Sequence, residues 1–556
     1  MQQLRTSDKN RTEVLCAVFY WILALLVIAA GVCPRFGMPQ WPLMDKDSVS
    51  YLAPAISKYA GGAFEGMQSR SFPYPAMIYA ALAAFNSFKA VAVLQHLSGI
   101  LAGILMILAW NQARFLIRLP MLPELAYRLI GLLPALIFLI SSKNMLYEHF
   151  LRPEAVMPFF VMGAVFLTVQ FIRAALAEDR TRAAFIYGTA LIFDSALMYF
   201  IKPSWGFNVL LCSLPVAVSF FAKKEPFGWK ALRMAVPVIL VLGLLVWPDR
   251  VLKKRDPMGN LFLPETLFVI HANIILNQLD ADLNHNDTAY STELLRSVEQ
   301  TLREEIHPEK AARKMATMDF DPDYLHFRSP LFQKMRDELG DNERLASFCF
   351  YYYKRAFFKR PMEMGQKIRK SMSVFYRAEC PVYEAEKKGI SLAKAYADTV
   401  KLISIRSTAN QSPARSLYLE ACKNLGHAKH VIRPSWLGPG VYKALRFSFL
   451  PSLIAAMILC LGIFFSGSLR PGLWLFGAFV LLMFSYNFGN CLTVSIAHTL
   501  GIRRYVHSQQ VFVVFAHFLA LVLLLETGLA IWRQQRRITR RKTVEENAPI
   551  AATLQG

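Results

Sequence analysis

The chain has 556 residues, of which 54% are hydrophobic. It contains 62 Lys and Arg residues and 39 Asp and Glu residues, which give a formal net charge of +23. So large an apolar fraction over this length is typical of a protein that crosses a membrane several times, and it argues against one soluble domain. Basic residues gather in short loops between apolar runs, which is the charge pattern that orients membrane proteins. Because no compact basic domain stands out, we predict that nucleic acid is not a partner.

Apolar runs predict ten membrane spans. The first run, 14–33, follows three basic residues and is not followed by a small-residue cleavage site, so we predict an uncleaved signal anchor. The other nine runs are 90–110, 129–142, 155–172, 183–201, 206–222, 234–247, 447–465, 473–495 and 511–532. The alternation of basic loops predicts that both termini lie in the cytoplasm. Because no eukaryotic retention signal is visible, we expect the inner (cytoplasmic) membrane of a bacterium.

The composition changes between the seventh and eighth runs. Residues 249–446 are polar and charge-rich, and their length indicates a domain rather than a linker. The aromatic and basic run 348–360 within it is interpreted as a helix resting on the bilayer, in preference to a nucleic-acid site. The predicted fold class is an all-α polytopic membrane protein with an outer, mainly helical domain. The predicted parts are a transmembrane module 1–248 with a first outer loop 34–88, an extracytoplasmic domain 249–446, transmembrane helices 447–532 and a basic cytoplasmic tail 533–556.

The first outer loop carries two carboxylates, Asp45 and Asp47, ahead of a predicted surface helix over 48–59. In an extended chain, residues two apart point to the same side. One carboxylate could take a proton from an acceptor hydroxyl, or the two together could hold a divalent metal such as Mg or Mn. The alternative is a solvated loop that caps the helix, with Asp47 or Ser48 as N-cap. Spacing alone favours this capping interpretation.

Charged residues also gather in other predicted outer loops. The second outer loop holds a dense polar set, Glu148, His149, Arg152 and Glu154. These residues line a site with the first loop or merely pair with each other at the membrane surface. Cations on the outer side are Arg70, Lys202, Arg503 and Arg504. Because membrane proteins keep most of their cations inside, these four favour an anionic partner such as a lipid phosphate over ordinary headgroup contact.

The order of these pieces resembles the GT-C membrane glycosyltransferases that use polyprenyl-phosphate sugars, which include protein O-mannosyltransferases and lipid A aminoarabinose transferases. The resemblance covers mainly the membrane part up to residue 247 and the last spans. The resembling positions are Asp47-Ser48-x-x-Tyr51-Leu52, Arg70-x-x-Pro73-x-Pro75, Gln95, Glu148 to Glu154, Lys202-Pro203 and Arg504-Tyr505.

The resemblance implies an inverting transfer of a sugar from a polyprenyl-phosphate carrier to an unidentified glycolipid, polysaccharide or protein acceptor, at the outer membrane face. Asp47 would then be the general base, and outer cations would neutralise the donor phosphate. Either Glu148 or Glu154 would be the second-loop acid, and Asp45 would be a metal ligand or a bystander. The implied catalytic residues are Asp47, Asp45 and Glu148. The implied substrate-binding residues are Tyr51, Arg70, Arg152, Glu154, Lys202, Arg503, Arg504 and Tyr505.

Two other classes of function compete with this hypothesis. A transporter or flippase of lipid-linked glycans should show related halves and broken helices at mid-membrane. The sequence has no visible repeat of this kind, and its polar candidates lie at the outer face instead. A structural membrane subunit would carry the same loop aspartates without using them in chemistry.

Overall fold

The computed structural model of the chain is almost entirely helical. It describes residues 2–67, 70–222, 226–255, 260–285, 288–306, 318, 320–377, 390–405, 414–426, 431–432, 438–502, 504–505 and 508–553. Within these ranges, extended structure amounts to an isolated bridge and one antiparallel pair of two-residue strands, β1 (Ile390–Ser391) and β2 (Val431–Ile432). The predicted all-α class is therefore confirmed.

Eight helices in the described part of the chain are long and apolar enough to cross a membrane. Each supplies about 20 apolar residues, and a helix satisfies its own backbone N–H and C=O groups in lipid. They are α1 (Gln2–Phe36), α4 (Phe88–Ala113) with η1 (Arg114–Leu116), α7 (Met157–Ile172) with η3 (Arg173–Ala177), α8 (Thr181–Ile201), α9 (Gly206–Ala222) after η4 (Pro203–Trp205), α10 (Phe227–Val241) with η5 (Leu242–Val246) and α11 (Trp247–Arg255), α24 (Arg470–Ala497) and α26 (Gln510–Thr553).

Two bent pairs of helices are candidates for further spans: α5 (Glu124–Leu139) with α6 (Ser142–His149), bent by 50°, and α22 (Gly438–Phe447) with α23 (Phe449–Phe465), bent by 46°. At the first bend, the Ser141 hydroxyl accepts a hydrogen bond from the Asn144 backbone N–H at 3.3 Å, so α6 begins as a newly capped helix. Counted as one span each, the pairs bring the total to the ten predicted spans. The polytopic fold is confirmed.

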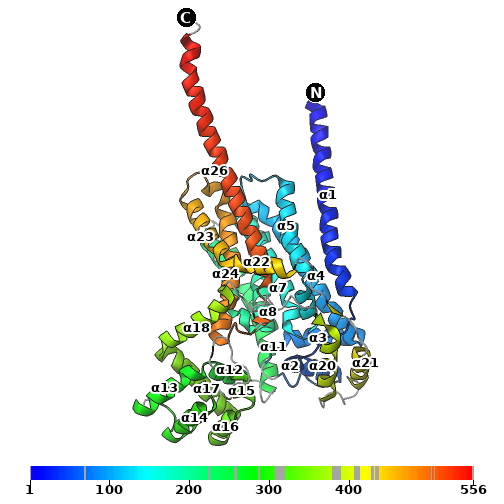
Figure 1. The fold of residues 1–556 in the computed structure, drawn as a ribbon, viewed down its shortest axis with the longest axis vertical. Coiled ribbons are helices and arrows are strands. Elements are labelled where there is room, and N and C mark those ends of the chain that lie inside the picture. The colour runs from blue at the N-terminus through cyan, green and yellow to red at the C-terminus, as the bar shows by residue number, and fades with distance from the viewer. Residues whose placement is uncertain are drawn as a thin grey trace.

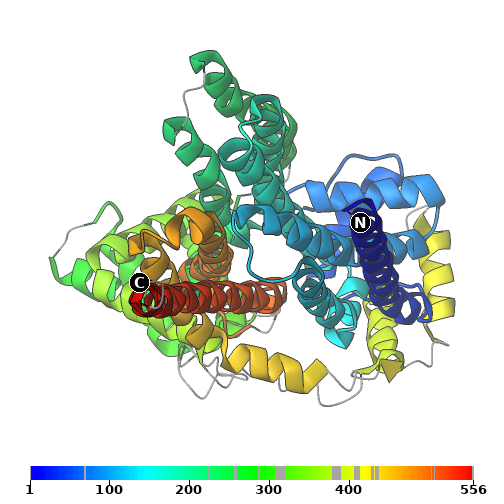
Figure 2. The same ribbon diagram turned by 90° about the horizontal axis from the view of Figure 1, so that it is seen from above.

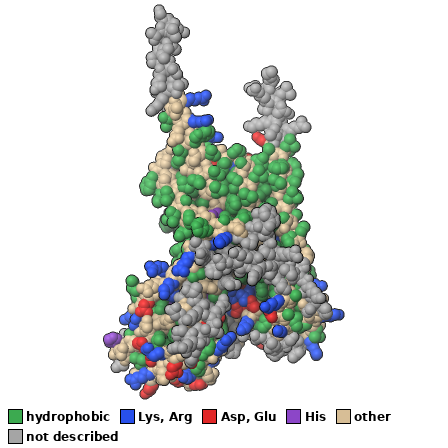
Figure 3. Space-filling model, viewed as in Figure 1, with side chains coloured by type: hydrophobic (Ala, Val, Ile, Leu, Met, Phe, Trp, Pro, Cys, Tyr) green, Lys and Arg blue, Asp and Glu red, His purple; other side chains and the backbone are tan. Residues whose placement is uncertain are grey.

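The exposed surface of these helices is apolar, as lipid requires. Leu25, Ile239 and Ile458 are 65%, 66% and 64% exposed, values that a soluble protein would rarely tolerate in a continuous band. Figure 3 shows this hydrophobic band, with charged side chains gathered on the lobes below it. Both termini lie at the same end of the molecule, opposite these lobes (Figure 1). The side of the membrane on which each end lies stays a prediction.

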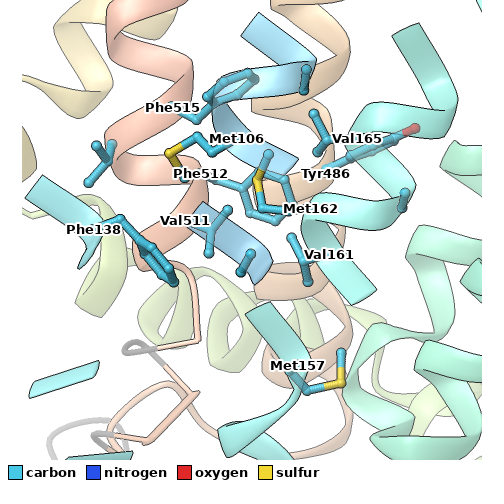
Figure 4. Packing of buried hydrophobic residues seen from close by; sticks show 14 of the residues in the cluster. Met106, Phe138, Met157, Val161, Met162, Val165, Tyr486, Val511, Phe512 and Phe515 are labelled. Atoms are coloured by element: carbon cyan, nitrogen blue, oxygen red, sulfur yellow. The ribbon is translucent and has the colours of Figure 1, made fainter. Parts of the chain in front are cut away.

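The membrane helices share one core. Side chains from α4, α5, α7, α24 and α26 interdigitate there, among them Met106, Phe138, Met162 and Phe515 (Figure 4). Close approach depends on glycine in places: a Cβ on Gly131 of α5 would overlap the indole of Trp110 on α4. Small residues of this kind let membrane helices pack through van der Waals contact.

The end opposite the termini carries two lobes, seen side by side in Figures 1 and 2. The first, the α12–α17 lobe, has its own hydrophobic core. It comprises α12 (Phe262–Ile270), α13 (Ala272–His285), α14 (Thr292–Glu305), α15 (Pro322–Phe327), α16 (Leu331–Leu339) and α17 (Asn342–Lys359), and α18 (Pro361–Tyr376) joins it to α24. The second, the α20–α21 lobe, comprises α20 (Leu392–Ile405) and α21 (Ala414–Gly426), and lies near the surface helices α2 (Ser48–Tyr59) and α3 (Pro73–Phe85).

The polar segment 249–446 therefore divides between two cores. Residues of α12–α17 pack among themselves, whereas Phe375, Tyr396 and Tyr418 join the core of the membrane helices. The aromatic run 348–360 buries Phe348 and Tyr352 inside the α12–α17 lobe and leaves Phe350 and Phe358 exposed, so its contact with the bilayer stays a prediction. The other predicted part boundaries stay predictions.

The contact between Gly131 and Trp110 yields a stability test. Gly131→Ala should destabilise the protein by about 1–3 kcal/mol, because the added methyl overpacks a rigid, buried indole. The matched control is Gly462→Ala on α23, where an added Cβ meets no atom within 4 Å. Thermal unfolding of both variants in one detergent would measure the difference. Equal melting temperatures for the two variants would contradict the packing of α4 against α5.

Candidate functional site

The loops predicted as the first and second outer loops are joined by backbone hydrogen bonds. Leu43 N–H donates to the His149 carbonyl at 2.7 Å, and Leu151 N–H donates to the Leu43 carbonyl at 2.9 Å, which makes a parallel bridge. The bridge brings together the residues that follow it on the two loops, so that Asp45 forms an ion pair with Arg152. This bridge explains how two loops about 100 residues apart in sequence form one site.

Asp45 is the residue that caps α2. Its Oδ1 accepts hydrogen bonds from the backbone N–H of Asp47 at 3.0 Å and of Ser48 at 3.1 Å, and its own N–H donates to the Ser48 hydroxyl at 3.0 Å. This reciprocal arrangement satisfies donors that a helix start leaves open. Asp47 occupies the N-cap position, as expected, but its side chain makes no capping hydrogen bond, and Asp45 supplies the acceptor instead. The other oxygen of Asp45 pairs with Arg152.

The side chain of Asp47 makes no capping hydrogen bond to the start of α2 and contacts cations instead. Its Oδ2 pairs with Arg504, which lies between α24 and α26, and lies 3.4 Å from Nη2 of Arg152. Burial alone would raise the pKa of Asp47, but the positive charges of these two arginines and of Arg70 lower it below the usual value. Asp47 is therefore an ionised carboxylate held by guanidinium groups from two distant segments.

Glu154 and Lys202 form a second ion pair beside the first. Lys202 Nζ lies 2.9 Å from Glu154 Oε1, and Nε of Arg504 lies 4.0 Å from the same oxygen. Both partners of the pair are buried. Burial alone would raise the pKa of Glu154, but Lys202, followed by Arg504, lowers it well below the ordinary range. The ring of Tyr505 lies 5.1 Å from both Lys202 and Arg504 and covers this cluster.

Aromatic side chains complete one wall. The Arg70 guanidinium lies 5.0 Å from the ring of Tyr51 and 5.0 Å from that of Phe262, and its Nε donates to the Ser50 hydroxyl at 3.2 Å. Tyr51 in turn packs edge-on against Tyr74. Burial raises the pKa of Tyr51 to about 12, so its hydroxyl remains a hydrogen-bond donor at neutral pH. Sequence reasoning did not single out Ser50 or Phe262, which carry no motif.

The cluster has more cations than acids. Arg70, Arg152, Lys202 and Arg504 face Asp45, Asp47 and Glu154, which leaves one positive charge beside exposed edges of Asp47 and Arg504. Figure 3 shows basic and acidic side chains gathered in the hollow between the two lobes, below the hydrophobic band. Such an arrangement can accept an added anion at the membrane boundary.

The predicted metal role of Asp45 and Asp47 does not fit this geometry. In the ranges that the structure describes, no three His, Cys, Asp or Glu side chains gather as a metal site would require. Both aspartates instead share the guanidinium of Arg152, whose positive charge opposes a divalent cation. We therefore derive no chemistry through Mg or Mn.

One predicted residue, Glu148, lies apart from the cluster, and another cannot be placed within the described part of the chain. Arg503 lies outside the described residues. Glu148 is fully buried among the membrane helices, where Arg35 of α1 donates to both its oxygens at 2.7 Å and Nδ1 of His96 lies 2.8 Å away. A Cβ on Gly99 would overlap this carboxylate, so α4 is shaped around it. The geometry favours a structural role for Glu148 in tying three helices together.

Comparisons with known proteins add little to these contacts. No family model matches the sequence, and no curated protein sequence matches it. Among solved structures, the chain is similar to ArnT from Cupriavidus metallidurans bound to undecaprenyl phosphate, with a TM-score of 0.32 and 10% sequence identity over 91% of this chain and 77% of that chain. Both values are too low for this likeness to carry a conclusion about function.

The placement of Glu148 predicts a loss of stability on substitution. Glu148→Gln removes the charge that compensates the buried Arg35, and breaking a buried pair costs about 3–5 kcal/mol. The control is Glu124→Gln, an acid that is 58% exposed and pairs with Arg128 one turn away, where about 0–1 kcal/mol is expected. Melting temperatures of the purified variants report both. If Glu148→Gln melts like wild type but loses activity, the structural role is excluded.

Proposed function

We propose that the protein is a membrane glycosyltransferase that moves a sugar from a polyprenyl-phosphate carrier to an acceptor at the outer face of the cytoplasmic membrane. The observation that carries this proposal is the convergence of Asp47 with Arg152, Lys202 and Arg504, from four separate segments, at the edge of the hydrophobic band. The order of the same residues along the chain resembles the GT-C glycosyltransferases. The sugar and the acceptor are not specified by the site.

A phosphate on a lipid suits this position. Its polyprenyl chain stays among the exposed apolar side chains of the membrane helices, while the phosphate reaches the cations at their end. Arginine binds phosphate oxygens bidentately, and Arg152 and Arg504 present their guanidinium groups in a largely buried setting where charge interactions are strong. Arg70 and Lys202 lie on either side and extend the positive surface.

Asp47 is proposed as the general base. Its lowered pKa keeps it ionised, but the same ion pairs make it a weak base until a donor arrives. When the donor phosphate takes Arg504, Asp47 loses the partner that lowers its pKa most and becomes more basic. Phosphate binding would thus activate the base, and acceptor deprotonation would be confined to the occupied site.

The proposed step is a single displacement. Asp47 takes the proton from an acceptor hydroxyl as the acceptor oxygen bonds to the anomeric carbon of the sugar. The bond between that carbon and the phosphate oxygen breaks, and its electron pair goes to the phosphate. The polyprenyl phosphate that leaves gains negative charge, which the arginines and Lys202 stabilise. Attack from the face opposite the leaving phosphate would invert the anomeric configuration.

Glu154 rather than Glu148 is proposed as the second-loop acid of the site. Glu154 contacts Lys202 and lies near Arg504, so it holds the phosphate-binding cations in place. Glu148 faces the interior of the bundle with Arg35 and His96. Asp45 is proposed as a positioning residue, because its carboxylate is used by the helix cap and by Arg152.

The two aspartates should respond differently to substitution. Asp47→Asn removes the base and should lower transfer by about 10²–10⁴-fold. Asp45→Asn keeps a good N-cap and should cost far less, although it loses the ion pair with Arg152. The assay follows label from a set of polyprenyl-phosphate sugars into acceptor in membranes of each variant. Equal losses of transfer activity in the two variants would contradict the role of Asp47 as general base.

The ion pair of Asp47 also sets an expected pH dependence. The base works only when ionised, so its activity is lost as pH falls through the folded-state pKa, which lies below the ordinary value of about 3.9. Wild-type kcat/KM should therefore show no acid limb from Asp47 above about pH 4. Arg504→Gln removes the positive charge that lowers the pKa of Asp47 most, so this pKa should rise. The residual activity of the variant should then fall on the acid side at a higher pH than in wild type. Normalised profiles of kcat/KM against pH that have the same shape in wild type and Arg504→Gln would contradict the proposed pairing of Asp47 with Arg504.

A further inference from the structure

The segment that carries Arg504 is held by the helix α18, which connects the core of the α12–α17 lobe, through Met364, with the core of the membrane helices, through Phe375. Arg504 follows the end of α24 by seven residues, after a connection of turns and bends over residues 498–502. A long, flexible arginine on such a connection needs an external support to stay beside Asp47. The contacts of residues 495–502 identify that support.

Lys367 of α18 closes the end of α24. Its Nζ donates to the backbone carbonyls of Ser495 at 2.7 Å and His498 at 2.6 Å, and lies 3.4 Å from that of Ile496. The last carbonyls of a helix have no partner inside the helix, and a cation there also complements the helix dipole. Lys367 is 8% exposed, so this ammonium group is committed to the contact and does not serve as a surface charge.

Ser371, one turn further along α18, holds the next residues. Its hydroxyl accepts a hydrogen bond from the Leu500 N–H at 3.0 Å, and Ser371 is fully buried. Residues four apart on a helix lie on one face, so Lys367 and Ser371 grip the connection as a pair. Ile502 then packs against the core of the α12–α17 lobe, and Arg504 follows two residues later.

We propose that Lys367 and Ser371 are positioning residues that fix Arg504 against Asp47, so that the α12–α17 lobe sets the geometry of the anion site through α18. The proposal rests on the proposed function for its meaning in catalysis, but the contacts themselves are independent of it. The α20–α21 lobe supports the opposite side of the site: the Met44 N–H donates to the Thr399 hydroxyl at 3.1 Å, just ahead of Asp45. The α12–α17 lobe therefore supports the segment of Arg504, and the α20–α21 lobe supports the segment that leads to Asp47.

The first test measures hydrogen exchange of the amides in residues 498–505, with full-length protein in lipid nanodiscs. Lys367→Met should raise the exchange of this segment at least tenfold, while peptides of α12–α17 keep their wild-type protection. Lys370→Met is the matched control, since Lys370 lies on the same helix and is exposed. Lys367→Arg keeps a cation and should restore most of the protection.

The outcomes of this test are distinct. Wild-type exchange in Lys367→Met, or equal loosening in Lys370→Met, would overturn the proposal. Should Lys367→Met fail to fold, Ser371→Ala serves instead, because it removes a single hydroxyl; a rise of about threefold at Leu500 is expected, against none in Ser373→Ala. Loosening spread over the whole α12–α17 lobe in Ser371→Ala would mean general instability and would also overturn the proposal.

A double-mutant cycle connects the contact to the anion site. Affinity for polyprenyl phosphate is measured for Lys367→Met, Arg504→Gln and the double variant. Because Lys367 acts through Arg504, the double variant should bind no more weakly than Arg504→Gln alone. Additive losses would overturn the positioning role. If wild type itself binds no polyprenyl phosphate, the proposed function fails, and the exchange measurement still decides whether Lys367 holds the segment.

Discussion

The site depends on one constraint: Asp47 is a partly buried carboxylate, 34% exposed, that must keep cationic partners. Those partners, Arg152 and Arg504, come from the second outer loop and from the last connection between spans, about 100 and more than 400 residues away. Removing either would leave charge uncompensated in a setting that solvates it poorly. The Leu43–Phe150 bridge and the cap made by Asp45 can be understood as the local structure that makes these ion pairs possible.

The surrounding architecture serves the same arrangement. The membrane helices bring the ends of distant segments to one boundary, and the buried Arg35–Glu148–His96 cluster fixes three of them close by. Cations gather at the end of the molecule opposite both termini, where they pair with Asp47 and Glu154. A lipid-linked phosphate would replace Asp47 as the partner of Arg504. Binding of the donor and activation of the base are therefore a single event in the proposed mechanism.

Sequence reasoning succeeded where a pattern is local. Hydropathy located the eight long apolar helices and the two bent pairs, and the helix predicted over 48–59 has the bounds of α2. It failed where a choice depends on direction or on distant partners. Asp45 and Asp47 are equivalent by spacing, and only the turn into α2 separates the cap from the ion-paired carboxylate. Glu148 and Glu154 lie six residues apart, but α6 ends between them and sends them to different surroundings. The aromatic run 348–360 did not reveal that one of its faces packs inside a separate lobe, because a surface helix and a core helix share amphipathic spacing.

The most direct measurement is photo-crosslinking of the protein in nanodiscs with a polyprenyl phosphate that carries a diazirine next to its phosphate. It needs neither the sugar nor the acceptor. The account predicts that label attaches to the peptides containing Asp47, Arg152 and Arg504, that unlabelled polyprenyl phosphate competes for it, and that Arg504→Gln abolishes it. Label found only on lipid-facing helix surfaces, or label that unlabelled polyprenyl phosphate does not displace, would contradict the account.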